Sequence, residues 1–70
     1  MKTERLIKMA NDISNFFNAD SDKEIAAEGV KNHIVKNWEP RMREAILEYL
    51  KQDGSALTPL AKAALAKIAG

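Results

Sequence analysis

Near the middle of the chain, Asn37 to Arg43 read NWEPRMR and contain the only tryptophan, one of two prolines and two arginines. Pro40 has no backbone N–H and its ring pushes Glu39 towards an extended conformation, so a helix that precedes the proline ends there. The fixed φ of Pro40 also suits the first residue of a new helix. The stretch therefore predicts a corner between two helices.

Before this corner, apolar residues recur at steps of three and four, the period of an amphipathic helix. They predict a first helix over about residues 4–18 with Thr3 as its N-cap. Ser21 and Glu24 have the spacing of a capping box, which predicts that a second helix begins there and runs to about residue 37. The predicted inner faces are Leu6, Met9, Ala10, Ile13, Phe16 and Phe17 in the first helix, and Ile25, Ala26, Gly29, Val30, His33 and Ile34 in the second.

After the corner, a third helix is predicted over about residues 40–52, ended by the pair Asp53-Gly54. Thr58-Pro59 has the order of a cap followed by a proline and predicts the start of a fourth helix. The sequence thus indicates one all-α domain over residues 1–70, a small bundle of about four short helices. The predicted apolar faces are Met42, Ile46, Tyr49 and Leu50, then Leu57, Leu60, Ala64, Leu65 and Ile68.

The composition predicts a thin core. Leu, Ile, Val and Phe together number 16, whereas alanine alone supplies 11 residues and adds little buried area. A domain of this size rarely gains more than about 3–5 kcal/mol from its core without a staple, and the absence of cysteine excludes a disulfide. A glycine inside a helix, such as Gly29, costs about a further 1 kcal/mol relative to alanine. This cost is tolerable if a neighbouring backbone passes close to it, although a glycine on the surface would give the same pattern.

Charge and hydropathy argue against several classes of protein. The net charge of +1 gives no bulk attraction for nucleic acid or anionic lipid, and no apolar run reaches the roughly 18 residues of a membrane span. The charged start, Met1 to Arg5, lacks the apolar region of a secretory signal. We therefore expect a cytoplasmic protein that binds neither membrane nor nucleic acid.

Catalytic and metal-binding residues are sparse. His33 is the only histidine, with no second metal ligand at a suitable spacing, and we expect it to lie part-buried between helices, bonded to a carbonyl or carboxylate. The acidic residues near the start of the second helix suit capping and the helix dipole. The sequence predicts a non-catalytic chain without a metal or cofactor of its own.

A binding surface is the better hypothesis for the NWEPRMR stretch. Tryptophan and arginine are enriched in interface hot spots, so Trp38 is a candidate apolar anchor. Arg41 and Arg43 are candidate partners for carboxylates, carbonyls or cofactor phosphates on the partner. The alternative is that Trp38 is the largest core residue, with Glu39 paired to an arginine. The candidate partner-binding residues are Trp38, Arg41, Met42, Arg43, His33, Phe16 and Phe17.

Several of these residues resemble a known family. The segment Lys8-Met9-Ala10-Asn11-x-Ile13, the pairs Phe16-Phe17 and His33-Ile34, and the segment Trp38 to Met42 are similar to the delta subunit of cytoplasmic NAD-dependent molybdenum formate dehydrogenases. The resemblance spans nearly the whole chain, and its most specific element is Trp-x-Pro-Arg-Met. Such subunits typically carry an aromatic residue before the tryptophan, where this chain has Asn37.

The resemblance implies a small accessory chain that binds the catalytic (alpha) subunit and supports cofactor insertion, assembly or stability. It also implies that a molybdenum bis-guanine-dinucleotide cofactor, iron–sulfur clusters, FMN and NAD are bound by other subunits of the complex. Two alternatives stay open from the residues alone. One is a small helical nucleic-acid-binding module, and the other is a module that completes its thin core by self-association.

Overall fold

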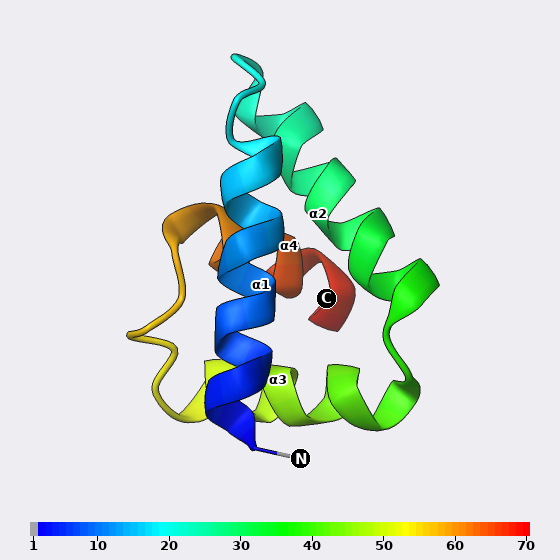
Figure 1. Ribbon diagram of the computed structural model, residues 1–70, viewed down its shortest axis with the longest axis vertical. Coiled ribbons are helices and arrows are strands. Elements are labelled where there is room, and N and C mark those ends of the chain that lie inside the picture. The colour runs from blue at the N-terminus through cyan, green and yellow to red at the C-terminus, as the bar shows by residue number, and fades with distance from the viewer. Residues whose placement is uncertain (1) are drawn as a thin grey trace.

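The computed structural model describes residues 2–70 and confirms the predicted all-α fold. Its helices are α1 (Thr3–Phe17), α2 (Lys23–Asn37), α3 (Pro40–Gln52) and α4 (Pro59–Ala69), with no strand among the described residues (Figure 1). α1 and α2 run in opposite directions from the turn at residues 18–22, and α3 crosses the first turns of α1. α4 packs against α1 and α2, so four helices enclose one core.

The proline corner forms as predicted. Trp38 and Glu39 are both extended, with ψ of 141° and 154°, and Pro40 is the first residue of α3. At the next boundary, Gly54 has a φ of +70°, the left-handed conformation that favours glycine after a helix. Thr58 then caps α4, since its Oγ1 accepts a hydrogen bond from the N–H of Ala61 at 3.1 Å.

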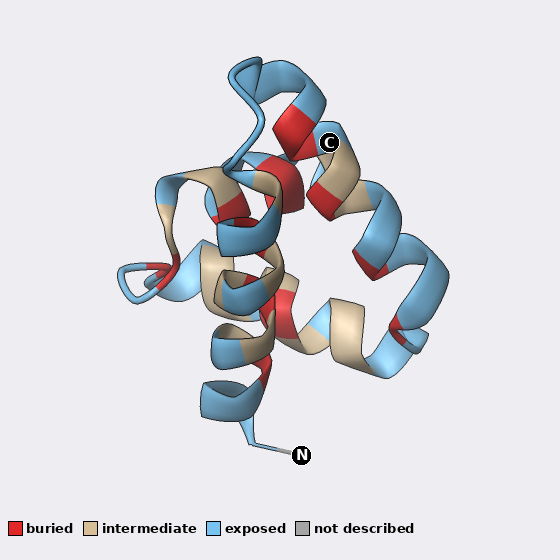
Figure 2. Cartoon of the chain, turned by 45° about the horizontal axis from the view of Figure 1, so that its top comes forward, coloured by how far each residue is buried: buried red, intermediate tan, exposed pale blue. Residues whose placement is uncertain are grey.

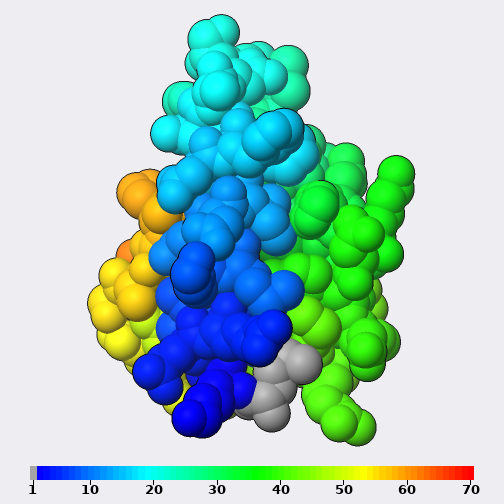
Figure 3. Space-filling model, in the orientation of Figure 1, coloured from blue at the N-terminus to red at the C-terminus, as the bar shows by residue number. Residues whose placement is uncertain are grey.

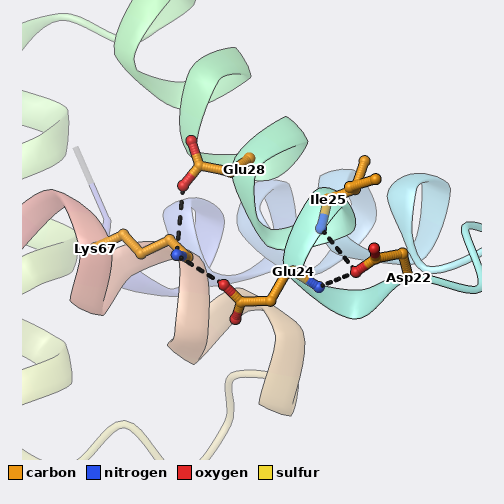
Figure 4. Close-up of polar contacts among 5 residues, drawn as sticks. All are labelled: Asp22, Glu24, Ile25, Glu28 and Lys67. Atoms are coloured by element: carbon orange, nitrogen blue, oxygen red, sulfur yellow. Dashed lines mark hydrogen bonds and ion pairs between the residues drawn. The ribbon is translucent and has the colours of Figure 1, made fainter.

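Two predicted caps are wrong. Thr3 lies inside α1, and the N-cap is Lys2, whose side chain makes no capping hydrogen bond. α2 is capped by Asp22 instead of Ser21: the Asp22 carboxylate accepts from the N–H groups of Glu24 at 3.0 Å and Ile25 at 3.4 Å (Figure 4). A carboxylate accepts both bonds and is also favoured by the positive end of the helix dipole, which explains the shift by one residue.

The core is built around small residues on α2 and α4. In Figure 2 most of the buried stretches of the helices lie on the side turned towards the centre of the bundle. Alanines supply nearly half of them, and they let helices pack closely with little apolar area. The buried apolar residues are Leu6, Ala10, Ala26, Ala27, Val30, Ile34, Trp38, Ile46, Leu57, Ala61, Ala64 and Leu65.

The inner face of α2 differs from the predicted one. Ala27 is buried, whereas Ile25 is 58% exposed and His33 is also exposed. α2 packs against α4 as well as α1, and contact with α4 brings the alanine side of α2 inward. This rotation leaves a larger apolar residue, Ile25, on the surface.

A side chain accounts for Gly29, where the sequence suggested a neighbouring backbone. A Cβ built on Gly29 would lie 2.5 Å from Cδ1 of Phe17. The absence of a side chain on α2 therefore makes room for the aromatic ring at the end of α1.

Polar contacts from α1 fix the loop between α3 and α4. The Asn11 side chain donates to the carbonyl oxygen of Ala56 at 2.9 Å and accepts from the N–H of Thr58 at 2.9 Å. The buried Ser14 hydroxyl shares a hydrogen bond with the Thr58 hydroxyl at 2.6 Å. Tyr49 contributes from α3, because its hydroxyl accepts from the N–H of Ala56 at 3.0 Å.

Candidate docking surface

Trp38 belongs to the core. Its side chain is only 5% exposed and clusters with Ile34 and Ile46, among other buried residues. The role of an exposed anchor does not fit this position, and the alternative that Trp38 is a large core residue does. The second part of that alternative, an ion pair between Glu39 and an arginine, is wrong, because Glu39 forms none within residues 2–70. Indole burial removes a large apolar area from water, which this alanine-rich core otherwise lacks.

Arg43 joins the two sides of the corner. Its Nη1 donates to the carbonyl oxygen of Val35 at 2.9 Å and to that of Trp38 at 3.2 Å. The carbonyls of a final helical turn have no intrahelical partner and carry the negative end of the dipole. The guanidinium therefore satisfies the end of α2, which explains why an arginine stands in the first turns of α3.

Of the four candidate residues at the corner, Arg41 and Met42 neither lie in the core nor bond across the corner. The Arg41 side chain is exposed and has no ion pair within the described part of the chain. Met42 is half-buried against the core and lines a surface groove with Met9. These two residues remain available to a partner.

An aromatic cluster lies where α1 and α2 are side by side. Phe16 is 76% exposed, and its ring meets that of Phe17 edge-on, with centroids 5.1 Å apart. The His33 ring lies 6.5 Å from the Phe17 ring. Ile13, Asp12 and these three rings line an open groove of about 310 Å³, named here the α1–α2 groove. Both helices lie on the face turned to the viewer in Figure 3.

The prediction for His33 is wrong in two respects. The residue does stand beside α1, but it is exposed, and its imidazole makes no hydrogen bond to a carbonyl or carboxylate in residues 2–70. Its position next to the ring of Phe17 replaces the expected polar contact. The structure therefore brings Phe16, Phe17 and His33 together in one place, apart from the Trp38 corner. Partner binding by the candidate residues stays a prediction.

Two exposed apolar residues on α2 were missed. Ile25 was assigned to the core, and Val35, which is 44% exposed, was not considered. Together with Phe16 they are the large apolar side chains most open to water, and all three come from α1 and α2. The alanine pair Ala26-Ala27 could have indicated which side of α2 is buried, because small residues mark the face of a helix that packs closely against another.

An ion-pair cluster between α2 and α4 was also missed. The Lys67 ammonium lies 3.3 Å from a carboxylate oxygen of Glu28 and 3.4 Å from one of Glu24 (Figure 4). Hydrogen bonds to Glu28 and to Glu24 raise the pKa of Lys67 above its ordinary value of 10.5. The acidic residues at the start of α2 thus have two different roles. Asp22 caps the helix, while Glu24 and Glu28 form ion pairs with Lys67 of α4.

Metal-ligating groups do not gather in the part of the chain that the structure describes. No three His, Asp or Glu side chains of residues 2–70 are placed to hold a metal ion together. No helix in this range has the length and apolar character that a membrane crossing requires.

Fold and surface together define a small four-helix protein that carries exposed aromatic and aliphatic side chains on one helix pair. The chain belongs to the family of the NADH-dependent formate dehydrogenase delta subunit FdsD, whose family model matches residues 5–65. This match confirms the resemblance read from the sequence. Neither a curated protein nor a solved structure matches the chain.

Proposed function

We propose that this chain is a non-catalytic accessory subunit of a cytoplasmic NAD-dependent formate dehydrogenase and that it docks on the catalytic (alpha) subunit. The observation that carries the proposal is the family match over residues 5–65, which covers all four helices in whole or in large part. A delta subunit is by its name one component of a larger complex. The docked chain supports assembly, cofactor insertion or stability of that subunit.

The exposed apolar residues support a docking role. Large apolar side chains that stay in water mark interaction surfaces when they gather in one region. Phe16 is such a residue, and it stands at the rim of the α1–α2 groove beside His33. An aromatic rim next to an apolar groove suits a partner's aliphatic or aromatic side chain, because burial of both removes apolar area from water.

The chemistry of formate oxidation is assigned to other subunits in this proposal. A molybdenum bis-guanine-dinucleotide cofactor, iron–sulfur clusters, FMN and NAD would be bound there. Iron–sulfur clusters are held by cysteine thiolates, and this chain has no cysteine. Its residues therefore do not fit an iron–sulfur cluster.

The test is co-expression of the catalytic subunit with this chain, carrying an affinity tag, in three forms. These are the natural chain, Phe16→Ser, and the matched control Lys62→Ser, which changes an exposed residue of α4. The natural chain and the control are expected to retain the catalytic subunit on the column and to give equal molybdenum content per enzyme. Phe16→Ser is expected to lower both. The proposal would be overturned if the catalytic subunit bound the column no better with the tagged chain than without it, and if its molybdenum content were the same in both cases.

A further inference from the structure

A second groove lies between the first turns of α1 and the start of α3. It is open, has a volume of about 560 Å³, and is lined by Lys2, Arg5, Met9 and Met42. Two thioether side chains and two cations therefore share one concave surface. The Phe16 cluster does not contribute to it, so this surface is separate from the α1–α2 groove.

The cations of this groove have no ion-pair partner among the residues that the structure describes. Neither Lys2 nor Arg5 forms an ion pair with any carboxylate of residues 2–70, and neither does the exposed Arg41, the neighbour of Met42. Lys8 and Lys67 are the basic residues that do have a carboxylate partner within residues 2–70: Lys8 lies 2.9 Å from Asp12, and Lys67 is held by two glutamates. Positive charge beside the groove is thus left for a group outside this chain.

The two methionines indicate that the group bound in this groove is partly apolar. Methionine side chains are flexible and polarizable and adapt to apolar groups of different shape. Cations beside such a surface pair with carboxylates through short, charge-assisted hydrogen bonds. A free phosphate or a nucleic-acid backbone would use the cations and leave the thioethers without an apolar partner. A polypeptide segment satisfies both.

We propose that this groove receives an acidic segment of the catalytic subunit, with one apolar side chain against Met9 and Met42 and carboxylates paired with Lys2 and Arg5. The inference rests on the proposed function, because it names the chemistry by which the same partner is recognised. The opposite charges also predict how binding responds to salt, since attraction between exposed charges is screened as ionic strength rises.

The first experiment measures binding of the purified catalytic subunit to the natural chain, to Arg5→Glu and to the control Lys62→Glu. Glutamate near the start of a helix is favoured by the dipole, so Arg5→Glu is expected to fold. A like charge facing the acidic segment is expected to weaken binding about tenfold or more, and the natural chain is expected to lose affinity as salt is raised. Lys62→Glu is expected to bind as the natural chain does.

The second experiment uses a carbodiimide, which activates a carboxylate so that it condenses directly with an amine. Treatment of the complex is expected to join Lys2 to an aspartate or glutamate of the catalytic subunit, identified by mass spectrometry of the peptides. Lys2→Arg keeps the positive charge and lacks the amine, so it is expected to bind normally and to lose this cross-link.

The outcomes separate the two proposals. If the natural chain binds while Arg5→Glu binds equally well and Lys2 is never cross-linked, the groove is not the acidic contact, and the proposed function stands. If the natural chain does not bind the catalytic subunit at all, both proposals fail. If the cross-linked partner residue lies in a segment with an apolar side chain beside its carboxylate, the inference is supported.

Discussion

The ring of Phe17 fills the space that a side chain at Gly29 would need. A Cβ on Gly29 would lie 2.5 Å from Cδ1 and 2.6 Å from Cε1 of that ring, inside any normal contact distance. The pair fixes where α1 meets α2, and it also holds Phe17 beside Phe16 and His33. A packing requirement between two helices thus sets the shape of the candidate docking surface.

Gly29→Ala tests this relationship. Alanine gains about 1 kcal/mol of helix propensity, but the added methyl must displace the ring, and overpacking of this kind typically costs about 1–3 kcal/mol. We expect Gly29→Ala to leave the free energy of unfolding unchanged or to lower it. With Phe17→Leu already present, the same change is expected to stabilise. Urea unfolding of the four proteins of this cycle gives the coupling, and purely additive effects would contradict the contact.

Arg43→Met removes both hydrogen bonds from the corner while keeping an aliphatic chain of similar length. Two carbonyl oxygens at the end of α2 lose their partner, so we expect the free energy of unfolding to fall by about 1–3 kcal/mol. Arg41→Met is the matched control, because Arg41 is exposed and forms no ion pair with any residue from 2 to 70. It is expected to change stability by less than about 0.5 kcal/mol. Equal effects of the two substitutions in denaturant titrations would show that Arg43 does not brace the corner.

Asn11→Ala removes two contacts that hold the loop between α3 and α4. The carbonyl of Ala56 and the N–H of Thr58 would lose their partner, and we expect a loss of about 1–3 kcal/mol in thermal or urea unfolding. Asn15→Ala, on the exposed side of α1, provides the comparison and is expected to be nearly neutral. Hydrogen exchange of residues 53–58 should speed up only in Asn11→Ala. Unchanged exchange in that loop would disprove the assignment.

Lys67 predicts a dependence of stability on alkaline pH. Its pKa is raised in the folded protein by hydrogen bonds to Glu28 and Glu24, so folding favours the protonated lysine. The stabilisation is fully present below the unfolded-state pKa, and it is lost as pH rises through the higher folded-state value. We expect the natural chain to exceed Lys67→Met in stability by a constant amount between pH 7 and about 10, with the difference closing above that range. A difference that persists unchanged at the most alkaline pH would refute the ion-pair explanation.

Local signals in the sequence predicted the helices well. Pro40, Gly54 and Thr58-Pro59 each act on the backbone within a few residues, and each marks the boundary that the structure has. The caps of α1 and α2 were each missed by one residue, which is the usual uncertainty of a helix boundary. At α2 the reason is that Ser21 and Asp22 both suit a cap, and their tertiary surroundings are not visible in the sequence.

The candidate site was predicted less well, because it depends on contacts between distant residues. Periodicity placed Ile25 inside, but the packing of α2 on α4 turned it outward. The contact of Arg43 with Val35 reaches across the corner, and those of Asn11 join residues 45 and 47 positions apart. The sequence left open whether Trp38 lies in the core or at a partner surface, and the structure places its side chain in the core.

The central claim is that the chain binds the catalytic subunit of its formate dehydrogenase. Light scattering coupled to size-exclusion chromatography measures this directly, on a mixture of the two purified proteins. We expect one peak whose molar mass equals that of the catalytic subunit plus this 7.8 kDa chain. Two separate peaks with the masses of the free proteins, at concentrations well above micromolar, would contradict it.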